Sequence, residues 1–208
     1  TALTWPFPVH YRVVRGASPD LVVRRGGEGT LDAFVAAARD LVADGVDGIT
    51  TNCGFLALFQ TELAAAVPVP VATSSLMQVA MVNRLLAPGR RAGILTISGS
   101  ALTARHLELA GVPPGTPVGT TEGGREFTRA ILGNEPELDV DLARADNVEA
   151  ARALAADHPG LGAIVLECTN MVPYAADIRA ATGLPVFSIE TFVRWFQAAL
   201  VPRRYPAP

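Results

Sequence analysis

The chain has 208 residues, a formal net charge of −3, 50% hydrophobic residues and 18% charged residues. This length exceeds one average domain and falls short of two large ones, so we expect two small lobes. The charged fraction lies below the roughly 25% of an average soluble protein, and such an apolar excess is typical of parallel sheets whose strands are buried on both faces. The sequence has no basic stripe with interleaved aromatic residues, which argues against nucleic acid as a partner.

The first half of the chain predicts alternating helices and strands. Residues 5–15 look extended, and Gly26-Gly27 marks a loop. From residue 30 onward the apolar spacing is that of one helix face, with Leu31, Phe34 and Ala38 among its members. The elements expected next are a strand at 46–51, a helix at 54–66, a strand at 69–72 and a helix at 75–86.

The second half repeats this alternation. Its expected elements are a strand at 91–97, a helix ending near 110, a short strand, a helix-rich insertion at 122–157 broken near Gly133 and Pro136, a strand at 161–166, a helix at 170–182, a strand at 184–188 and a helix at 191–200. Strands alternating with helices predict parallel βαβ units with right-handed crossovers. We therefore expect an α/β fold of two pseudo-symmetric lobes, residues 1–90 with 189–208 and residues 91–188, with the active site in the cleft between them.

Residues 63–83 carry no charge, but prolines and polar residues divide the stretch, so we expect no membrane span there. The start of the chain does not resemble a signal peptide, and two cysteines far apart do not form a disulfide framework. A cytoplasmic location is the default prediction. The chain begins at Thr1 rather than at a methionine, so we expect residues upstream of it.

The most informative pattern is a repeat that carries both cysteines of the chain. The segments GVDGITTNC and GLGAIVLEC end at Cys53 and Cys168, which lie 168 − 53 = 115 positions apart. The same offset separates Pro70 from Pro185, each of which begins the next apolar run. Both cysteines therefore fall at strand-to-helix turns. Ligands bind outside the carboxyl ends of the strands in such sheets, so we expect both thiols at one site.

Two facing thiols suit an enzyme that removes a proton from one face of a carbon and returns one to the other face. A thiol with an ordinary pKa of ~8.5 becomes a better base near a helix N-terminus, which lowers that pKa. The alternatives are a cysteine that packs as a small core residue or a disulfide between the two. Polar residues at the same turns can hold a carboxylate or cap helices, namely Asn52, Thr73, Ser74, Thr169 and Asn170.

Other kinds of site have little support in the sequence. The three histidines, His10, His106 and His158, lack metal-ligand spacing, so we expect no metal site. The chain contains no lysine, which argues against a pyridoxal phosphate enzyme, and no dinucleotide-binding motif follows a strand. Ser98-Gly99-Ser100 could hold an anion at a helix start or act only as a turn and cap. We expect no cofactor.

The motifs TTNCGF around Cys53 and LECTNM around Cys168 resemble the cofactor-independent aspartate/glutamate racemase superfamily, and so does WPFPVHYRVVRGAS near the start. The resemblance covers nearly the whole chain. It implies two α/β lobes and a pair of catalytic cysteines, Cys53 and Cys168, acting as opposed acid and base. It also implies contacts to a substrate carboxylate from the polar residues named above and from Gly54. Asparagine precedes the first cysteine here, which departs from the pattern of many glutamate racemases.

From the paired thiols we predict a racemase of an aspartate- or glutamate-like amino acid. Hydantoin racemases, arylmalonate decarboxylases and maleate isomerases resemble the same fold and stay as alternatives, although the last two groups often lack a symmetric thiol pair. A carboxylate-binding protein without catalysis and a disulfide-stapled structural protein are the non-enzyme alternatives. The expected partners are a small carboxylate substrate and a second copy of the chain, because small lobes bury little of so much apolar surface.

Overall fold

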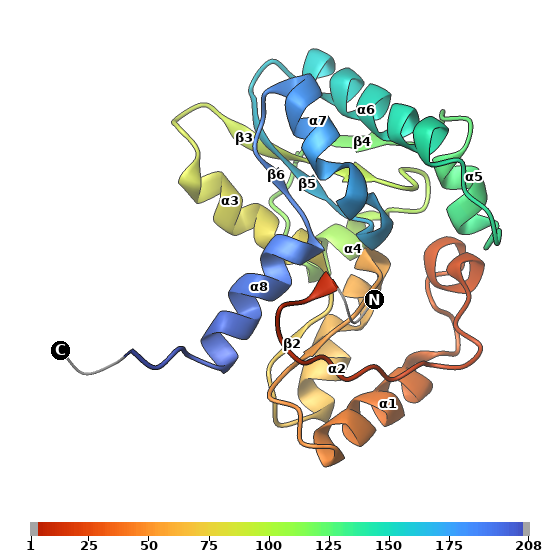
Figure 1. The fold of residues 1–208 in the computed structure, drawn as a ribbon, viewed down its shortest axis with the longest axis vertical. Helices are drawn as coiled ribbons and strands as arrows, with labels where there is room; N and C mark the ends of the chain where they lie inside the picture. Colours follow the sequence, from red (N-terminus) through yellow and green to blue (C-terminus); the bar gives the residue numbers. More distant parts are fainter. Residues whose placement is uncertain (1–3, 206–208) are drawn as a thin grey trace.

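The computed structural model describes residues 4–205 and contains two parallel β-sheets (Figure 1). The smaller sheet pairs β1 (Ile49–Thr50) with β2 (Val71–Ala72). The larger sheet has the order β4-β3-β5-β6. Its strands are β3 (Arg91–Thr96), β4 (Val118–Thr120), β5 (Leu161–Leu166) and β6 (Val186–Phe187). The predicted α/β class with parallel sheets flanked by helices is confirmed.

The helices alternate with the strands in the expected order. They are η2 (Asp20–Arg24), α1 (Leu31–Ala43), η3 (Gly54–Phe59), α2 (Gln60–Ala66), η4 (Ser75–Gln78), α3 (Val79–Leu85), α4 (Ala104–Leu109), α5 (Phe127–Leu132), α6 (Val140–Asp157), η5 (Thr169–Tyr174), α7 (Ala175–Thr182) and α8 (Ile189–Leu200). Of these, η2 is a π-helix and η3, η4 and η5 are 3₁₀-helices.

The structure differs from the predicted elements in several places, and the strands predicted at 69–72 and 184–188 are each reduced to two residues. The helices expected after the two cysteines and after β2 each begin with a 3₁₀ segment, and in η5 the missing N–H of Pro173 works against regular α-helical bonding. The strand predicted at 46–51 shrinks to the two residues of β1, which pairs with β2 alone. Residues 5–15, expected to be extended, belong to neither sheet, and η2 was not predicted.

The sequence repeat is also a structural repeat. Ile49 pairs with Val71 in the smaller sheet, and the residues 115 positions later, Ile164 and Val186, pair in the larger sheet. The ladder bonds match as well, because Ile49 N–H donates to the Pro70 carbonyl at 3.0 Å and Ile164 N–H to the Pro185 carbonyl at 2.9 Å. The 3₁₀-helices η3 and η5 each begin one residue after a cysteine.

The packing brings the two sheets together around the segments that follow the strands. Helices α6 and α7 pack side by side, α6 contacts β3 and β4, and α3 packs on β3 (Figure 1). The main hydrophobic core extends from the larger sheet into η3 and η4, where Phe55 and Leu76 are fully buried. The smaller sheet has a separate small core beneath α1 and α2. As a result, the segments after both cysteines are held by one continuous core.

Both strands of the smaller sheet lie within residues 1–90, and all four strands of the larger sheet lie within 91–188. Helix α8 packs beside Ala72 and Gly48, so the C-terminal helix sits against the smaller sheet. The exact limits of the two lobes stay a prediction. No helix in residues 4–205 has the length and apolar character needed to cross a membrane. The cytoplasmic location and the homodimer also stay predictions.

Candidate active site

The two cysteines occupy equivalent positions at the carboxyl ends of β1 and β5. Cys53 is the N-cap residue of η3 and Cys168 that of η5, both in extended backbone conformation. Both are free thiols, so the disulfide alternative is wrong. Cys53 is partly exposed, whereas Cys168 is buried with 8% of its surface accessible. The charge of Cys53 acts on Cys168, which places the two thiols in one electrostatic environment.

Hydrogen bonds tie the two cysteine turns to each other. The Thr169 hydroxyl donates to the Asn52 carbonyl at 2.7 Å, from one cysteine turn to the other. The Ser75 hydroxyl donates to the carbonyl of Leu166 at 2.6 Å and lies 3.1 Å from that of Glu167, which fastens η4 to the end of β5. The two halves of the repeat therefore meet at the residues that flank the thiols.

The predicted carboxylate contacts lie around these turns, but several already have internal partners. Thr73 and Ser74 are fully buried; the Thr73 hydroxyl donates to Gln60 Oε1 at 2.8 Å, and Ser74 Oγ accepts from the Leu76 N–H at 3.2 Å as the cap of η4. Asn170 is exposed, and its side chain and backbone N–H both act on the Cys168 sulfur. Contact of these residues, and of Asn52, Gly54 and Thr169, with a substrate stays a prediction.

Both thiols have raised pKa values, contrary to the prediction that helix N-termini would lower them. Burial, followed by the charge of Glu167, raises the pKa of Cys53 to about 12, while the backbone N–H groups of Phe55 and Leu56 act in the opposite direction. Burial, Glu167 and Cys53 raise the pKa of Cys168 well above its ordinary value. The short helices η3 and η5 give little dipole, so desolvation prevails.

Glu167 is a functional candidate that the sequence analysis missed. Its side chain is 1% exposed, and the Thr96 hydroxyl donates to its Oε2 at 2.8 Å. Burial raises its pKa to about 7 against the opposing effects of Thr96 and the backbone of Ile97. A carboxylic acid that follows the apolar strand LGAIVL directly was the signal, because such a position places an ionisable group at the end of a buried strand.

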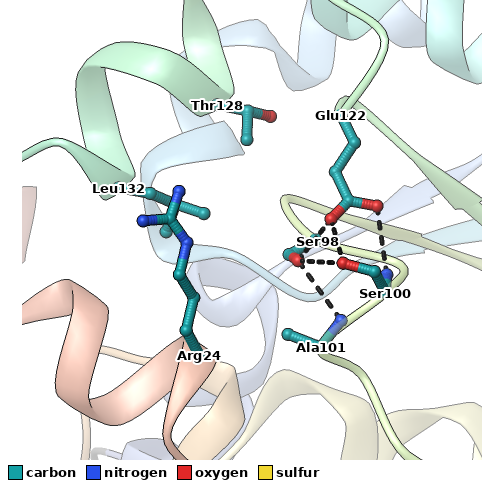
Figure 2. Close-up of a pocket in the computed structure, with 7 residues that line it drawn as sticks. All are labelled: Arg24, Ser98, Ser100, Ala101, Glu122, Thr128 and Leu132. Atoms are coloured by element: carbon teal, nitrogen blue, oxygen red, sulfur yellow. Dashed lines mark hydrogen bonds between the residues drawn. The ribbon is translucent and has the colours of Figure 1, made fainter.

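The structure also has a pocket of about 450 Å³ that neither cysteine lines (Figure 2). Its lining residues are Arg24, Ser98, Ser100, Ala101, Glu122, Thr128 and Leu132. In Figure 2 the Glu122 carboxylate faces Ser98 and Ser100, and it accepts from their hydroxyls at 2.6 and 2.5 Å and from the Ser100 N–H at 3.0 Å. The Ser98-Gly99-Ser100 turn thus holds an anion, the side chain of Glu122.

Comparisons with known proteins identify the family. No protein-family model matches the chain. The chain is 30% identical over 206 residues to a dimethylsulfoniopropionate lyase of Durusdinium sp. clade D, covering 93% of this chain and 67% of that protein. It is 32% identical to dimethylsulfoniopropionate lyases 7 and 6 of Emiliania huxleyi, covering 94% of this chain in both cases and 60% and 53% of those proteins. The chain belongs to the dimethylsulfoniopropionate lyase family.

Solved structures show the same fold at lower identity. An unliganded arylmalonate decarboxylase is 18% identical with a TM-score of 0.54, covering 88% of this chain and 81% of that one. An allantoin racemase of Pseudomonas fluorescens is 19% identical with a TM-score of 0.53, covering 86% and 79%. A glutamate racemase of Bacillus anthracis is 14% identical with a TM-score of 0.59, covering 91% and 71%. The resemblance to the aspartate/glutamate racemase superfamily is confirmed at the level of the fold.

The predicted amino-acid racemase is wrong, because the relatives that share 30–32% identity over nearly the whole chain are lyases. The family is one of enzymes, as predicted, but the expected isomerase class is not supported. The catalytic roles of Cys53 and Cys168 stay predictions. The chain spans between about half and two thirds of these relatives, so their whole-protein activity is carried over only as a proposal.

Proposed function

We propose that this protein is a lyase that cleaves dimethylsulfoniopropionate or a close sulfonium carboxylate by β-elimination. The observation that carries the proposal is the 30–32% identity to dimethylsulfoniopropionate lyases across 93–94% of the chain. Two free thiols at the carboxyl ends of β1 and β5 supply a base where this fold class binds ligands.

The chemistry follows from the structure of the substrate. A base removes a proton from the carbon next to the carboxylate, and the electron pair of that C–H bond forms a double bond to the next carbon. The carbon–sulfur bond breaks with its electron pair on sulfur. The products are dimethyl sulfide and acrylate, and one proton stays on the base. The reaction is redox-neutral, since the C–H electron pair becomes the new carbon–carbon bond and the C–S electron pair leaves with the sulfur.

Elimination differs from racemisation in the number of groups it needs. A racemase has to return a proton to the opposite face of the same carbon, whereas dimethyl sulfide leaves as a neutral molecule and takes no proton. One thiol therefore suffices as base. We assign this role to Cys53, because this residue is partly exposed while Cys168 is buried. The N–H groups of Phe55 and Leu56 favour the Cys53 thiolate.

The turns around the thiols supply groups for the rest of the substrate. Asn170 is exposed beside Cys168 and offers an amide to the carboxylate, whose binding also favours the carbanion-like charge that develops on the neighbouring carbon. The positive sulfonium of the substrate lowers the pKa of a nearby thiol, because an opposite charge favours the thiolate. Binding of the substrate therefore helps to generate the base that attacks it.

The direct test is product analysis with purified protein. We expect dimethyl sulfide in the headspace by gas chromatography and acrylate in solution by liquid chromatography in equal amounts when dimethylsulfoniopropionate is added. Reaction in deuterium oxide followed by NMR reports whether recovered substrate exchanges its protons. The Cys53→Ser variant is the matched control and should release both products about 1000-fold more slowly. Wild-type protein that is folded yet releases no dimethyl sulfide would contradict the assigned substrate.

A further inference from the structure

Glu167 is an ionisable group buried near both thiols, and none of the described residues supplies a cation that pairs with it. One carboxylate oxygen, Oε2, accepts from the Thr96 hydroxyl, and the backbone N–H of Glu167 donates to the Leu95 carbonyl at 2.9 Å. The other oxygen, Oε1, is buried and has no hydrogen-bond partner among the described residues. Buried carboxylates are costly unless paired, so an unpaired oxygen at this position calls for a functional reason.

The carboxyl group of Glu167 reaches from one cysteine turn to the other. It precedes Cys168 in the chain, and in space it is packed against Gly54, the residue that follows Cys53. A Cβ atom at Gly54 would overlap both Oε1 and the backbone carbonyl of Glu167. Glycine is therefore the residue that lets the carboxyl group lie this close to the Cys53 turn. This close approach places the unpartnered oxygen against Gly54, the residue next to Cys53, and the charge of Glu167 acts on the Cys53 thiol.

The groups that face Glu167 come from three segments. Cys53 lies on the turn after β1, Thr96 and the Ile97 backbone lie at the end of β3, and Cys168 is next in the chain. The charge of Glu167 acts on both thiols and disfavours their ionisation. Among the described residues, no ion pair involves Glu167. In a desolvated cluster of three acidic groups with no cation, one negative charge is tolerated far better than two.

We propose that Glu167 is a positioning residue that carries the single negative charge of the free site and accepts the proton of Cys53 when that thiol becomes the base. This inference rests on the proposed function. The S–H bond of Cys53 breaks, its electron pair stays on sulfur, and an O–H bond forms on the Glu167 carboxylate. After elimination the thiol holds the substrate proton, and Glu167 releases its own proton to solvent. The cycle thus yields dimethyl sulfide, acrylate and one proton.

The test measures the Cys53 thiol without substrate. In a Cys168→Ser background Cys53 is the single thiol, since the chain has two cysteines. Its alkylation by iodoacetamide is followed across pH, with and without Glu167→Gln. Loss of the neighbouring charge should move the thiolate titration down by about one pH unit, which raises the alkylation rate at pH 8 about tenfold. With both cysteines present, Glu167→Gln should lower dimethylsulfoniopropionate cleavage about 100-fold. A downward shift of the thiolate titration together with lower turnover is the combination expected from the loss of this charge.

The pH profile of cleavage gives a second reading. Wild-type activity should rise with pH through about 7, the pKa of Glu167, because the ionised carboxylate is the form that accepts a proton. Thr96→Val keeps the carboxyl group of Glu167 but removes the hydroxyl that donates to it, which raises the pKa of Glu167. The acidic limb of the profile, where activity rises with pH, should therefore move to higher pH. Glu167→Asp should restore part of the activity lost in Glu167→Gln. The control Glu62→Gln, on the exposed face of α2, should change none of these readings.

The outcomes separate this inference from the assignment of the substrate. An alkylation profile that is the same with glutamate and with glutamine at 167 would overturn the proposed role, even in a protein that cleaves dimethylsulfoniopropionate. An acidic limb that stays in place in Thr96→Val would overturn it as well. A shifted thiol titration in a protein that fails to release dimethyl sulfide would support the role of Glu167 and refute the substrate.

Discussion

The two cysteine turns have the same backbone plan and different environments. The residue before each cysteine shows the contrast, since Asn52 and Glu167 lie 167 − 52 = 115 positions apart. Asn52 is exposed, whereas Glu167 is 1% exposed. The reason is topological: β5 lies between β3 and β6, whereas among the described residues β1 pairs with β2 alone. A repeat can thus fix where two thiols stand while the surrounding sheet makes them chemically unequal.

The largest effect expected from this inequality is on catalysis. Cys53→Ser should reduce cleavage about 1000-fold because a general base contributes between about 100-fold and 10,000-fold. Cys168→Ser should cost less than about 100-fold, since elimination needs no second proton transfer. Steady-state release of dimethyl sulfide by both variants measures the ratio. Equal losses would contradict the assignment of one base and restore a symmetric role for the thiols.

The next effect concerns stability and pH. The pKa of Glu167 is raised from 4.5 to about 7, so the folded state holds the proton more tightly than the unfolded chain does. Its contribution is favourable at low pH and is lost as the pH rises from about 4.5 through 7. Each pH unit in this window changes the free energy of unfolding by about 1.4 kcal/mol. The stability of Glu167→Gln relative to wild type should therefore be up to about 3 kcal/mol greater at pH 8 than at pH 4.

Urea denaturation of both proteins across this pH range measures the difference. The comparison between variants cancels the contributions of carboxylates such as Asp146, whose backbone hydrogen bonds from residues 125–127 act the same way in both. A difference in stability that is independent of pH would show that Glu167 does not titrate in this window.

A smaller effect is expected from filling the contact between the turns. Gly54→Ala places a Cβ against the carboxyl group of Glu167, and overpacking of this kind costs about 1–3 kcal/mol. The equivalent position of the second copy, 115 residues later, is Thr169, which has room for a side chain. Thermal denaturation should therefore show a loss in Gly54→Ala and little change in Thr169→Ser, which keeps the hydroxyl. A Gly54→Ala protein as stable as wild type would contradict the close approach of Glu167.

The smallest effect is expected from the hydrogen bond between the turns. Thr169→Val removes the donor to the Asn52 carbonyl and should cost about 1 kcal/mol, the net value of one such bond. Thr182→Val is a matched control, since its hydroxyl donates to a carbonyl within α7, away from the site. Chemical denaturation monitored by circular dichroism compares the two. Increased alkylation of Cys53 in Thr169→Val alone would show that this bond also holds the turns together.

Local patterns in the sequence were enough to predict the fold class, the order of the strands and helices along the chain, and the position of both cysteines at strand ends. These follow from apolar runs, prolines and a repeat, all of which act locally along the chain. The start of the helix at 31–43 was predicted to within one residue, and the strand at 161–166 was predicted at both ends, because each is strongly patterned. The turns after the cysteines were harder, since their 3₁₀ geometry has no distinct sequence period.

The chemistry of the site depends on how the folded chain surrounds the two thiols. The apolar runs of the repeat could place Cys53 and Cys168 at strand ends. The direction of their pKa shifts depends instead on how deeply the protein buries the thiols and on the nearby carboxyl group of Glu167. The partners of Thr73 and Ser74, and the anion held by Ser98 and Ser100, likewise come from residues distant in the chain or from the fold of the turn. Desolvation and charge coupling are properties of three-dimensional neighbours, and a linear pattern does not contain them.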